Sequence, residues 1–174
     1  MNRAKVSIAA TMVSTMLAVP VIALGADKSP DADFFKHAAE AGIAEVEAGK
    51  LAQDKGNTAE KTFASQMVTD HTKTSTELKG LISSGKVKAE LPTALDSSHQ
   101  SKLDKLKGES GKDFSSDFDS MQVSAHKDAV SLFERYAKGG DNAELKNWAG
   151  KTLPTLKHHL EMAQDLGKSR QSSK

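Results

Sequence analysis

The feature that most constrains this fold is a helical periodicity in residues 61–82, KTFASQMVTDHTKTSTELKGLI. Apolar residues recur there at intervals of three and four, which is the spacing of one face of an α-helix. At about 100° of rotation per residue, four apolar residues fall within roughly 40° of His71 on that face. They are Ala64, Met67, Leu78 and Ile82. The segment therefore predicts a long amphipathic helix that directs a histidine toward the core.

Three further segments have the same apolar spacing, and typical start and stop residues bound all four. The predicted long helices begin and end near residues 30 and 55, 57 and 84, 110 and 138, and 141 and 166. No segment has the alternating pattern of a β-strand. The first two helices, and likewise the last two, are separated by a few residues, so each pair must form an antiparallel hairpin.

The connection between the second and third long helices, residues 86–111, is much longer than an up-down-up-down bundle needs. It contains a predicted short helix over residues 96–107, capped by Asp96. Only Leu95, Leu103 and Leu106 give this helix an apolar edge, so we expect it to lie on the surface. We predict an all-α, ferritin-like four-helix bundle: two antiparallel hairpins joined by a long crossover that carries a short helix.

The first 26 residues have the pattern of a secretory signal peptide. Arg3 and Lys5 precede an apolar or small stretch, Val6 to Leu24, and small residues follow for cleavage after Gly25 or Ala26. The alternative is an uncleaved membrane anchor, but Pro20 and the small-residue exit favour cleavage. The predicted organisation is a signal peptide over 1–26, the bundle over 27–168 and a polar tail over 169–174. We therefore expect a periplasmic or otherwise exported protein with no membrane span after cleavage.

Charge and cysteine content exclude several classes of partner and site. Without residues 1–26 the chain has 22 basic and 23 acidic residues, a balance that gives no reason to expect nucleic acid or anionic lipid. The chain has no cysteine, which excludes disulfides, thiol chemistry and thiolate metal sites. The partner is then expected to be an unidentified protein or a small ligand.

Each long helix supplies one candidate metal ligand: Glu45, His71, His126 and His159. Helical bundles build metal sites from side chains on facing helices, and imidazole with carboxylate suits zinc, iron, copper or manganese. His71 and His159 lie centrally on apolar faces, whereas Glu45 and His126 lie at the boundary of theirs. The alternative is a core network without metal, in which His71 and His159 bond one another, a threonine or a carbonyl freed by Pro154.

Di-iron enzymes of the ferritin-like fold use a Glu-x-x-His pair on each of two helices. This chain contains no Glu-x-x-His. Asp96 and His99 have that spacing, but they lie in the crossover without a partner pair. We therefore expect no ferroxidase or di-iron oxidase activity, and we predict that the protein is not an enzyme.

Four segments taken in order resemble the domain-of-unknown-function 4142 family. They are FFKHAAEAGIAEVEAGKLAQDK, FASQMVTDHTKTSTEL, MQVSAHKDAVSLFERYA and LKNWAGKTLPTLKHHLEMAQ. The resemblance implies a ferritin-like fold, export and a bacterial origin, but no established reaction. The family's acid, Asp-His and later histidines match Glu45, Asp70-His71, His126 and His159, respectively. Members are often labelled outer-membrane proteins, but these residues contain no strands for a barrel.

Two hypotheses of function follow from these patterns. The first is an exported bundle that binds one transition-metal ion or a small ligand through Glu45, His71, His126 and His159, in envelope stress protection. The second is a non-catalytic structural or interaction module, whose buried histidines only satisfy hydrogen bonds in the core. In the second case we expect its partner at an exposed apolar patch around Leu95, Leu103 and Leu106.

Overall fold

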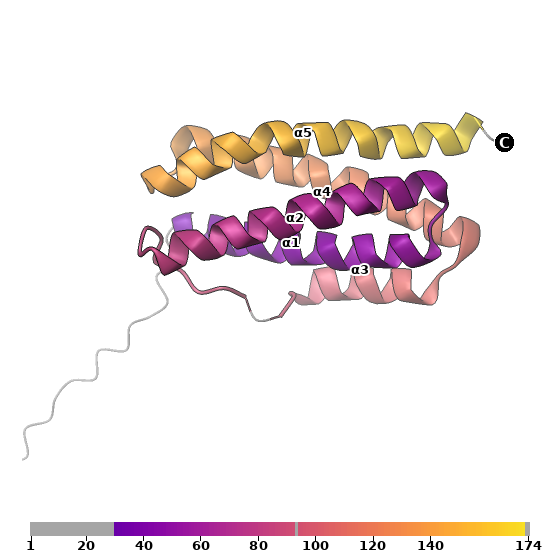
Figure 1. The fold of residues 1–174 in the computed structure, drawn as a ribbon, viewed down its shortest axis with the longest axis horizontal. Helices are drawn as coiled ribbons and strands as arrows, with labels where there is room; N and C mark the ends of the chain where they lie inside the picture. Colours follow the sequence, from indigo (N-terminus) through magenta and orange to yellow (C-terminus); the bar gives the residue numbers. More distant parts are fainter. Residues whose placement is uncertain (1–29, 93, 173–174) are drawn as a thin grey trace, which may run out of the picture.

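The computed structural model describes residues 30–92 and 94–172, and this part of the chain is all-α (Figure 1). Its helices are α1 (Pro30–Lys55), α2 (Thr58–Ser83), α3 (Ser97–Gly108), α4 (Gly111–Gly139) and α5 (Ala143–Ser172). α1 pairs with α2 and α4 pairs with α5, so the two predicted hairpins and the short helix between them are confirmed. The predicted signal peptide over 1–26 lies outside the described residues.

Side chains cap the starts of three helices, α2, α3 and α5. Asn57 accepts hydrogen bonds from the backbone of Ala59 and Glu60, and the Glu60 carboxylate accepts one from the Asn57 N–H, which completes a capping box. Asp96 accepts from the N–H of His99 at 2.8 Å and caps α3 as predicted. The fourth long helix, α5, begins one residue later than the sequence predicted. Asn142 caps it, because its side-chain oxygen accepts a hydrogen bond from the N–H of Leu145. α5 then continues past the predicted end at residue 166 to Ser172.

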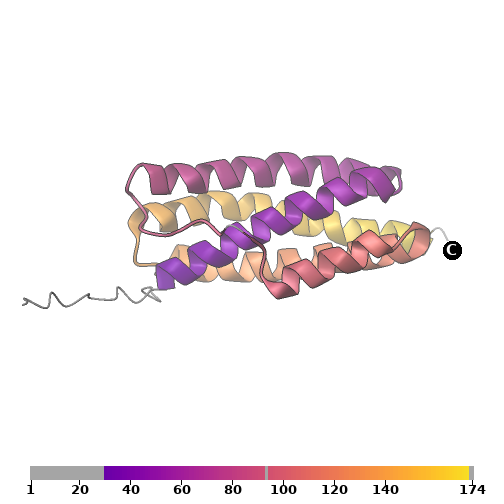
Figure 2. The same cartoon turned by 90° about the horizontal axis from the view of Figure 1, so that it is seen from below.

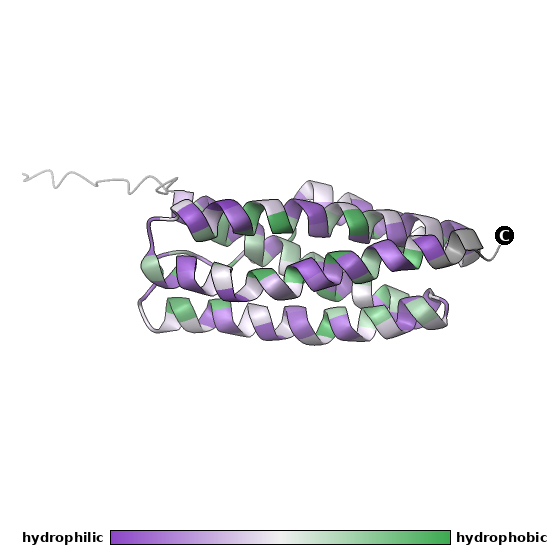
Figure 3. Ribbon diagram, turned by 90° about the horizontal axis from the view of Figure 1, so that it is seen from above, coloured by the Kyte–Doolittle hydropathy of each residue, from purple (hydrophilic) through white to green (hydrophobic). Residues whose placement is uncertain are grey.

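Two apolar clusters fill the bundle, one toward each end, and hydrophilic and hydrophobic residues are interspersed along every helix (Figure 3). The buried residues of the first cluster are Phe34, Phe35, Ala38, Ala39, Leu78, Val87, Phe133, Tyr136, Leu145, Trp148, Ala149 and Leu156. Those of the second cluster are Ala48, Ala52, Phe63, Ala64, Met67, Leu103, Leu106, Phe114, Phe118, Ala163 and Leu166. On each long helix, a short stretch that contains polar residues separates the two clusters.

The short helix α3 is packed into the second cluster, and the expectation of an exposed apolar patch is wrong. Leu103 and Leu106 are each only 2% exposed, and Leu95 is half-buried. The crossover runs along the outer side of α1 and delivers α3 to the same side of the bundle (Figure 2). Lys55, at the end of α1, fixes α3 there by donating from Nζ to the carbonyls of Lys107 and Glu109 at the end of α3.

Across the described ranges, the helices lack a stretch that is both long and apolar enough to cross a membrane.

Candidate metal centre

Three of the four predicted ligands meet between the two apolar clusters. His71 of α2, His126 of α4 and His159 of α5 are 7%, 1% and 1% exposed. One ring nitrogen of each lies within 4.8 Å of those of the other two, and no other group of three potential metal ligands lies this close among the described residues. The ring centroids are 5.4 to 5.7 Å apart. The three imidazoles therefore surround one small volume.

The apolar residues of each helix determine which way its histidine points. On α2, His71 lies between the buried Met67 and Leu78, as the helical spacing predicted. His126, at a boundary position in the sequence, is turned inward because Phe118 and Phe133 on either side of it are buried. Packing of the two ends thus keeps all three histidines buried.

Hydrogen bonds fix the proton position on two of the rings. His126 Nδ1 lies 2.9 Å from the carbonyl oxygen of Gln122, which can only accept, so Nδ1 carries the proton. His159 Nε2 lies 2.8 Å from Asp70 Oδ2, and the carboxylate likewise assigns the proton to Nε2. In the neutral rings, the other nitrogen of each, Nε2 of His126 and Nδ1 of His159, then has a free lone pair.

Those two nitrogens and Nε2 of His71 are buried and have no hydrogen-bond partner within the described part of the chain. A neutral His71 has a single N–H and can satisfy only one of the other two rings. At least one lone pair then stays unpaired, which costs about 1–3 kcal/mol for a buried acceptor. A cation placed between the rings would satisfy all three nitrogens together.

Burial keeps two of these imidazoles neutral at physiological pH. It lowers the pKa of His71 to about 3, and the neighbouring His126 and His159 add to the effect. Burial also lowers the pKa of His159, although the bond to Asp70 opposes the shift. Since metal ions bind the neutral form of imidazole, these rings need not release a proton before they bind one.

Asp70 is the residue that sequence reasoning missed. It faces about 100° away from His71 on α2, which makes it a poor hydrogen-bond partner for that residue. Its partner is instead His159 on α5. Although burial raises the pKa of Asp70, hydrogen bonds from Gln66 and His159 hold it below its usual value, so the carboxylate stays charged. Such a carboxylate behind a ligating imidazole is typical of metal sites.

Glu45, the fourth predicted ligand, is not a member of the three-histidine group. Its side chain on α1 is buried, and its Oε2 has no hydrogen-bond partner in the described residues. It lines a separate cavity of about 440 Å³ between α1, α3 and α4. Within the described residues, no hydrogen bond or ion pair joins Glu45 to the histidines.

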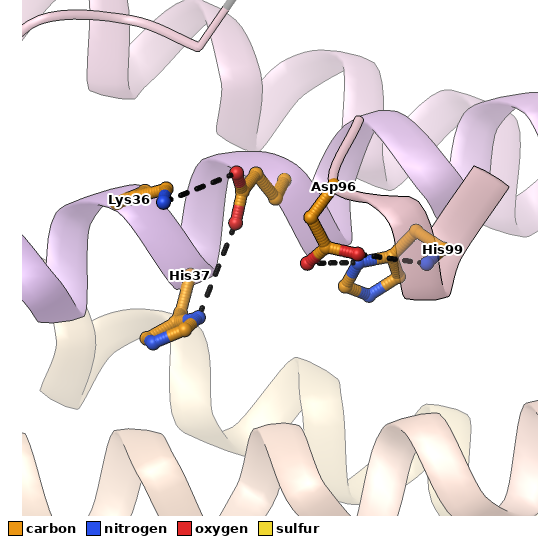
Figure 4. Close-up of polar contacts among 5 residues, drawn as sticks. Lys36, His37, Asp96 and His99 are labelled. Atoms are coloured by element: carbon orange, nitrogen blue, oxygen red, sulfur yellow. Dashed lines mark hydrogen bonds and ion pairs between the residues drawn. The ribbon is translucent and has the colours of Figure 1, made fainter. Parts of the chain in front are cut away.

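Other histidines have local partners (Figure 4). His37 Nδ1 lies 4.0 Å from Oε2 of the buried Glu40, which also pairs with Lys36 at 3.9 Å. His99 Nδ1 lies 2.9 Å from Asp96 Oδ2. The Asp-x-x-His spacing in the crossover is therefore a helix cap and not part of a metal motif.

Fold and site together define a class: an all-α protein of two helical hairpins with a buried cluster of three histidines. The model of a family described as a domain of unknown function, DUF4142, matches residues 20–166. The chain belongs to that family, as its sequence segments predicted. No curated protein and no solved structure matches the chain.

Proposed function

We propose that this protein is an exported metal-binding protein that holds one transition-metal ion between His71, His126 and His159. Two observations carry the proposal: one ring nitrogen of each histidine lies within 4.8 Å of those of the other two, and each ring has a buried nitrogen without a hydrogen-bond partner among the described residues. Two of the rings are held in the tautomer that leaves the buried, unpaired nitrogen with its lone pair. A polar core built only for stability would have paired these atoms.

The donor set favours some metals over others. Three imidazoles without a thiolate suit zinc, copper or iron, whereas manganese prefers carboxylate and water ligands. Two nitrogens on one tetrahedral zinc ion lie roughly 3.3 Å apart, given bonds of about 2.0–2.1 Å. The present separations are at most 4.8 Å, so side-chain adjustments on the order of 1 Å would close the site around an ion. The proposal assigns no coordination to Glu45.

Fold and compartment complete the proposal. Two hairpins joined by a long crossover support a ferritin-like bundle, and the N-terminal pattern supports export to the periplasm. Without a Glu-x-x-His pair, the site would bind its metal and not oxidise it. Sequestration of a metal ion is the form of envelope stress protection that such a protein would provide.

The test is elemental analysis of tag-free protein purified from the periplasm. We expect close to one equivalent of zinc, copper or iron, and we expect His71→Ala and His159→Ala to lose it. His158→Ala is the matched control, because it removes the adjacent, exposed histidine of the same helix. Folding of each variant is checked by far-ultraviolet circular dichroism. Full metal content in His71→Ala would contradict the proposal.

The competing function is a structural module whose histidines are core hydrogen-bonding groups, and the His159–Asp70 bond is the observation in its favour. It predicts protein that stays metal-free after incubation with each metal. It also predicts that His159→Ala lowers the free energy of unfolding without changing any metal titration.

A further inference from the structure

A small cavity lies directly beside the three-histidine cluster. It has a volume of about 30 Å³, and His71, His159 and Asp70 are among the residues that line it. One water needs roughly 10–15 Å³ of such volume. The cavity therefore has room for one or two waters, or for a ligand of two or three heavy atoms.

This space adjoins a metal that would be short of protein ligands. A tetrahedral ion takes four ligands, and sites with three protein ligands keep the fourth position for water or an exogenous group. The chain brings together three nitrogens, and Glu45 lines a different cavity. The fourth position can then be filled from the small cavity.

A surface groove of about 640 Å³ between α2 and α5 leads to the same place. Groove and cavity share five lining residues: Asp70, Thr74, Trp148, Thr152 and Thr155. A single layer of side chains, three of them threonines, therefore separates solvent in the groove from the space beside the histidines.

The charge of an ion in the site favours an anion, and two lysines lie at the rim of the groove. Lys73 and Lys151 are exposed at its rim, and neither has an ion-pair partner among the described residues. Three carboxylates of the groove are already engaged: Asp70 with His159, Glu77 with Trp148 Nε1 at 2.9 Å, and Glu144 with Lys86 at 3.5 Å. The groove has as many lysines as carboxylates, so the preference for an anion comes from the ion, whose charge neutral imidazole ligands leave uncompensated. The two unpaired ammonium groups lie on the path to that ion and add to its attraction at low ionic strength.

We infer that the metal bound by the three histidines keeps an open position, which takes a small anion of two or three heavy atoms arriving through the α2–α5 groove. The inference rests on the proposed metal site and adds the ligand class and the route. Water occupies the same position when no anion is present.

The experiment uses the mature protein loaded with cobalt(II), whose visible absorption reports its coordination, and azide as the probe. Azide is expected to change the spectrum in a saturable way with a stoichiometry of one. Lys73→Gln/Lys151→Gln should weaken azide binding about threefold or more at low ionic strength, an effect that added salt removes. Lys102→Gln/Lys127→Gln is the control, because it removes the same charge from exposed lysines that do not line this groove.

The outcomes separate the inference from the proposed function. A protein that binds one cobalt(II) but shows no spectral response to azide would overturn the open position and leave the metal site standing. Equal azide affinity in Lys73→Gln/Lys151→Gln and wild type would overturn the groove's role. Failure to bind cobalt(II), zinc(II) or copper(II) at all would overturn both.

The route has its own variant at Thr155, which is half-buried and lines both groove and cavity. Thr155→Leu should slow azide association in stopped-flow absorbance at least severalfold, whereas Thr155→Ser should leave the rate unchanged. The same rate in both variants would assign the ligand a different route.

Discussion

All four long helices contribute to both apolar clusters and to the polar layer between them, yet the side chains of these regions differ in how their atoms are paired. In the clusters, aromatic and aliphatic side chains pack on one another, as where Phe118 stacks on Phe114 with ring centroids 5.7 Å apart. The polar layer, defined as Glu45, His71, Gln122, His126 and His159, is equally buried but contains an unpaired polar atom on every one of its residues.

The difference indicates where stability and function lie. Apolar burial at the two ends contributes favourable free energy and holds the helices in register. Buried polar atoms without partners cost free energy, so a layer that retains several of them is stabilised elsewhere and is available for a ligand. The ends thus serve as the scaffold, and the layer is the part that a ligand would complete.

The largest expected effect is at the scaffold. Phe118→Ala removes a fully buried ring from the second apolar cluster and should lower the free energy of unfolding by about 3–5 kcal/mol in urea denaturation. The variant should still bind metal in its folded fraction.

His126→Leu, two turns further along α4, is the matched change in the polar layer. It should alter metal-free stability by no more than about 1 kcal/mol, because the loss of the Nδ1 hydrogen bond is offset by removal of the unpaired Nε2 and by an apolar side chain of similar size. Equal losses in the two variants would erase the distinction between the regions.

The second effect is a dependence of stability on pH that belongs to the polar layer. His71 has a folded pKa of about 3 and an unfolded value near 6.5, so between these values the unfolded chain binds more protons. Stability of the chelator-treated protein should therefore fall as the pH drops below 6.5, by up to about 1.4 kcal/mol per pH unit from this residue, and should show no contribution from it above pH 6.5.

The measurement is urea denaturation of wild type and His71→Leu from pH 7.5 to pH 4.5. Carboxylates and the other histidines titrate in both proteins, so the difference between the two curves isolates His71. Parallel curves would show that His71 takes up its proton in the folded state as readily as in the unfolded chain.

Asp70→Asn tests the polar layer from its edge. The substitution keeps an oxygen near His159 Nε2 but removes the charge that orients and polarises the ring. Metal affinity should fall 10- to 100-fold, about 1.4–2.7 kcal/mol, in a competition titration against a chelator. Glu134→Gln makes the same change in a carboxylate that pairs with the exposed Lys157 at 2.7 Å and should leave affinity unchanged. If both variants bind metal like wild type, Asp70 has no role in the site.

The scaffold could be predicted from sequence because its signals are local. Asn57 and Asp96 cap the helices that follow them, and hairpins follow from short connections. The position of α3 could not be predicted in this way. Three leucines are compatible with either an exposed or a docked helix, and the deciding contact comes from Lys55, some fifty residues earlier in the chain.

In the polar layer, burial could be predicted only for residues whose position on their own helix determines it. His71 and His159 lie centrally on apolar faces, so their burial could be read from spacing. His126 lies at a boundary, and it points inward because Phe118 and Phe133 of the same helix are buried, which its position on the helix did not settle. The partner of Asp70 could not be predicted because it is on α5, and the pairing of two helices sets a contact that neither sequence segment encodes alone.

The smallest effect, and the sharpest test of the polar layer, is at Gln122. Its side chain is fully buried beside the second apolar cluster, and neither amide atom has a hydrogen-bond partner in the described residues. Gln122→Leu fills the same space without a polar group, so it should raise the free energy of unfolding by about 1 kcal/mol in urea denaturation. The backbone carbonyl of residue 122, which fixes the His126 ring, is retained, so metal affinity should not change. A stabilised variant with lower metal affinity would make the Gln122 amide part of the metal site. A destabilised variant would mean that the amide is satisfied in solution, and the contrast between the layer and the scaffold would then be confined to the histidines.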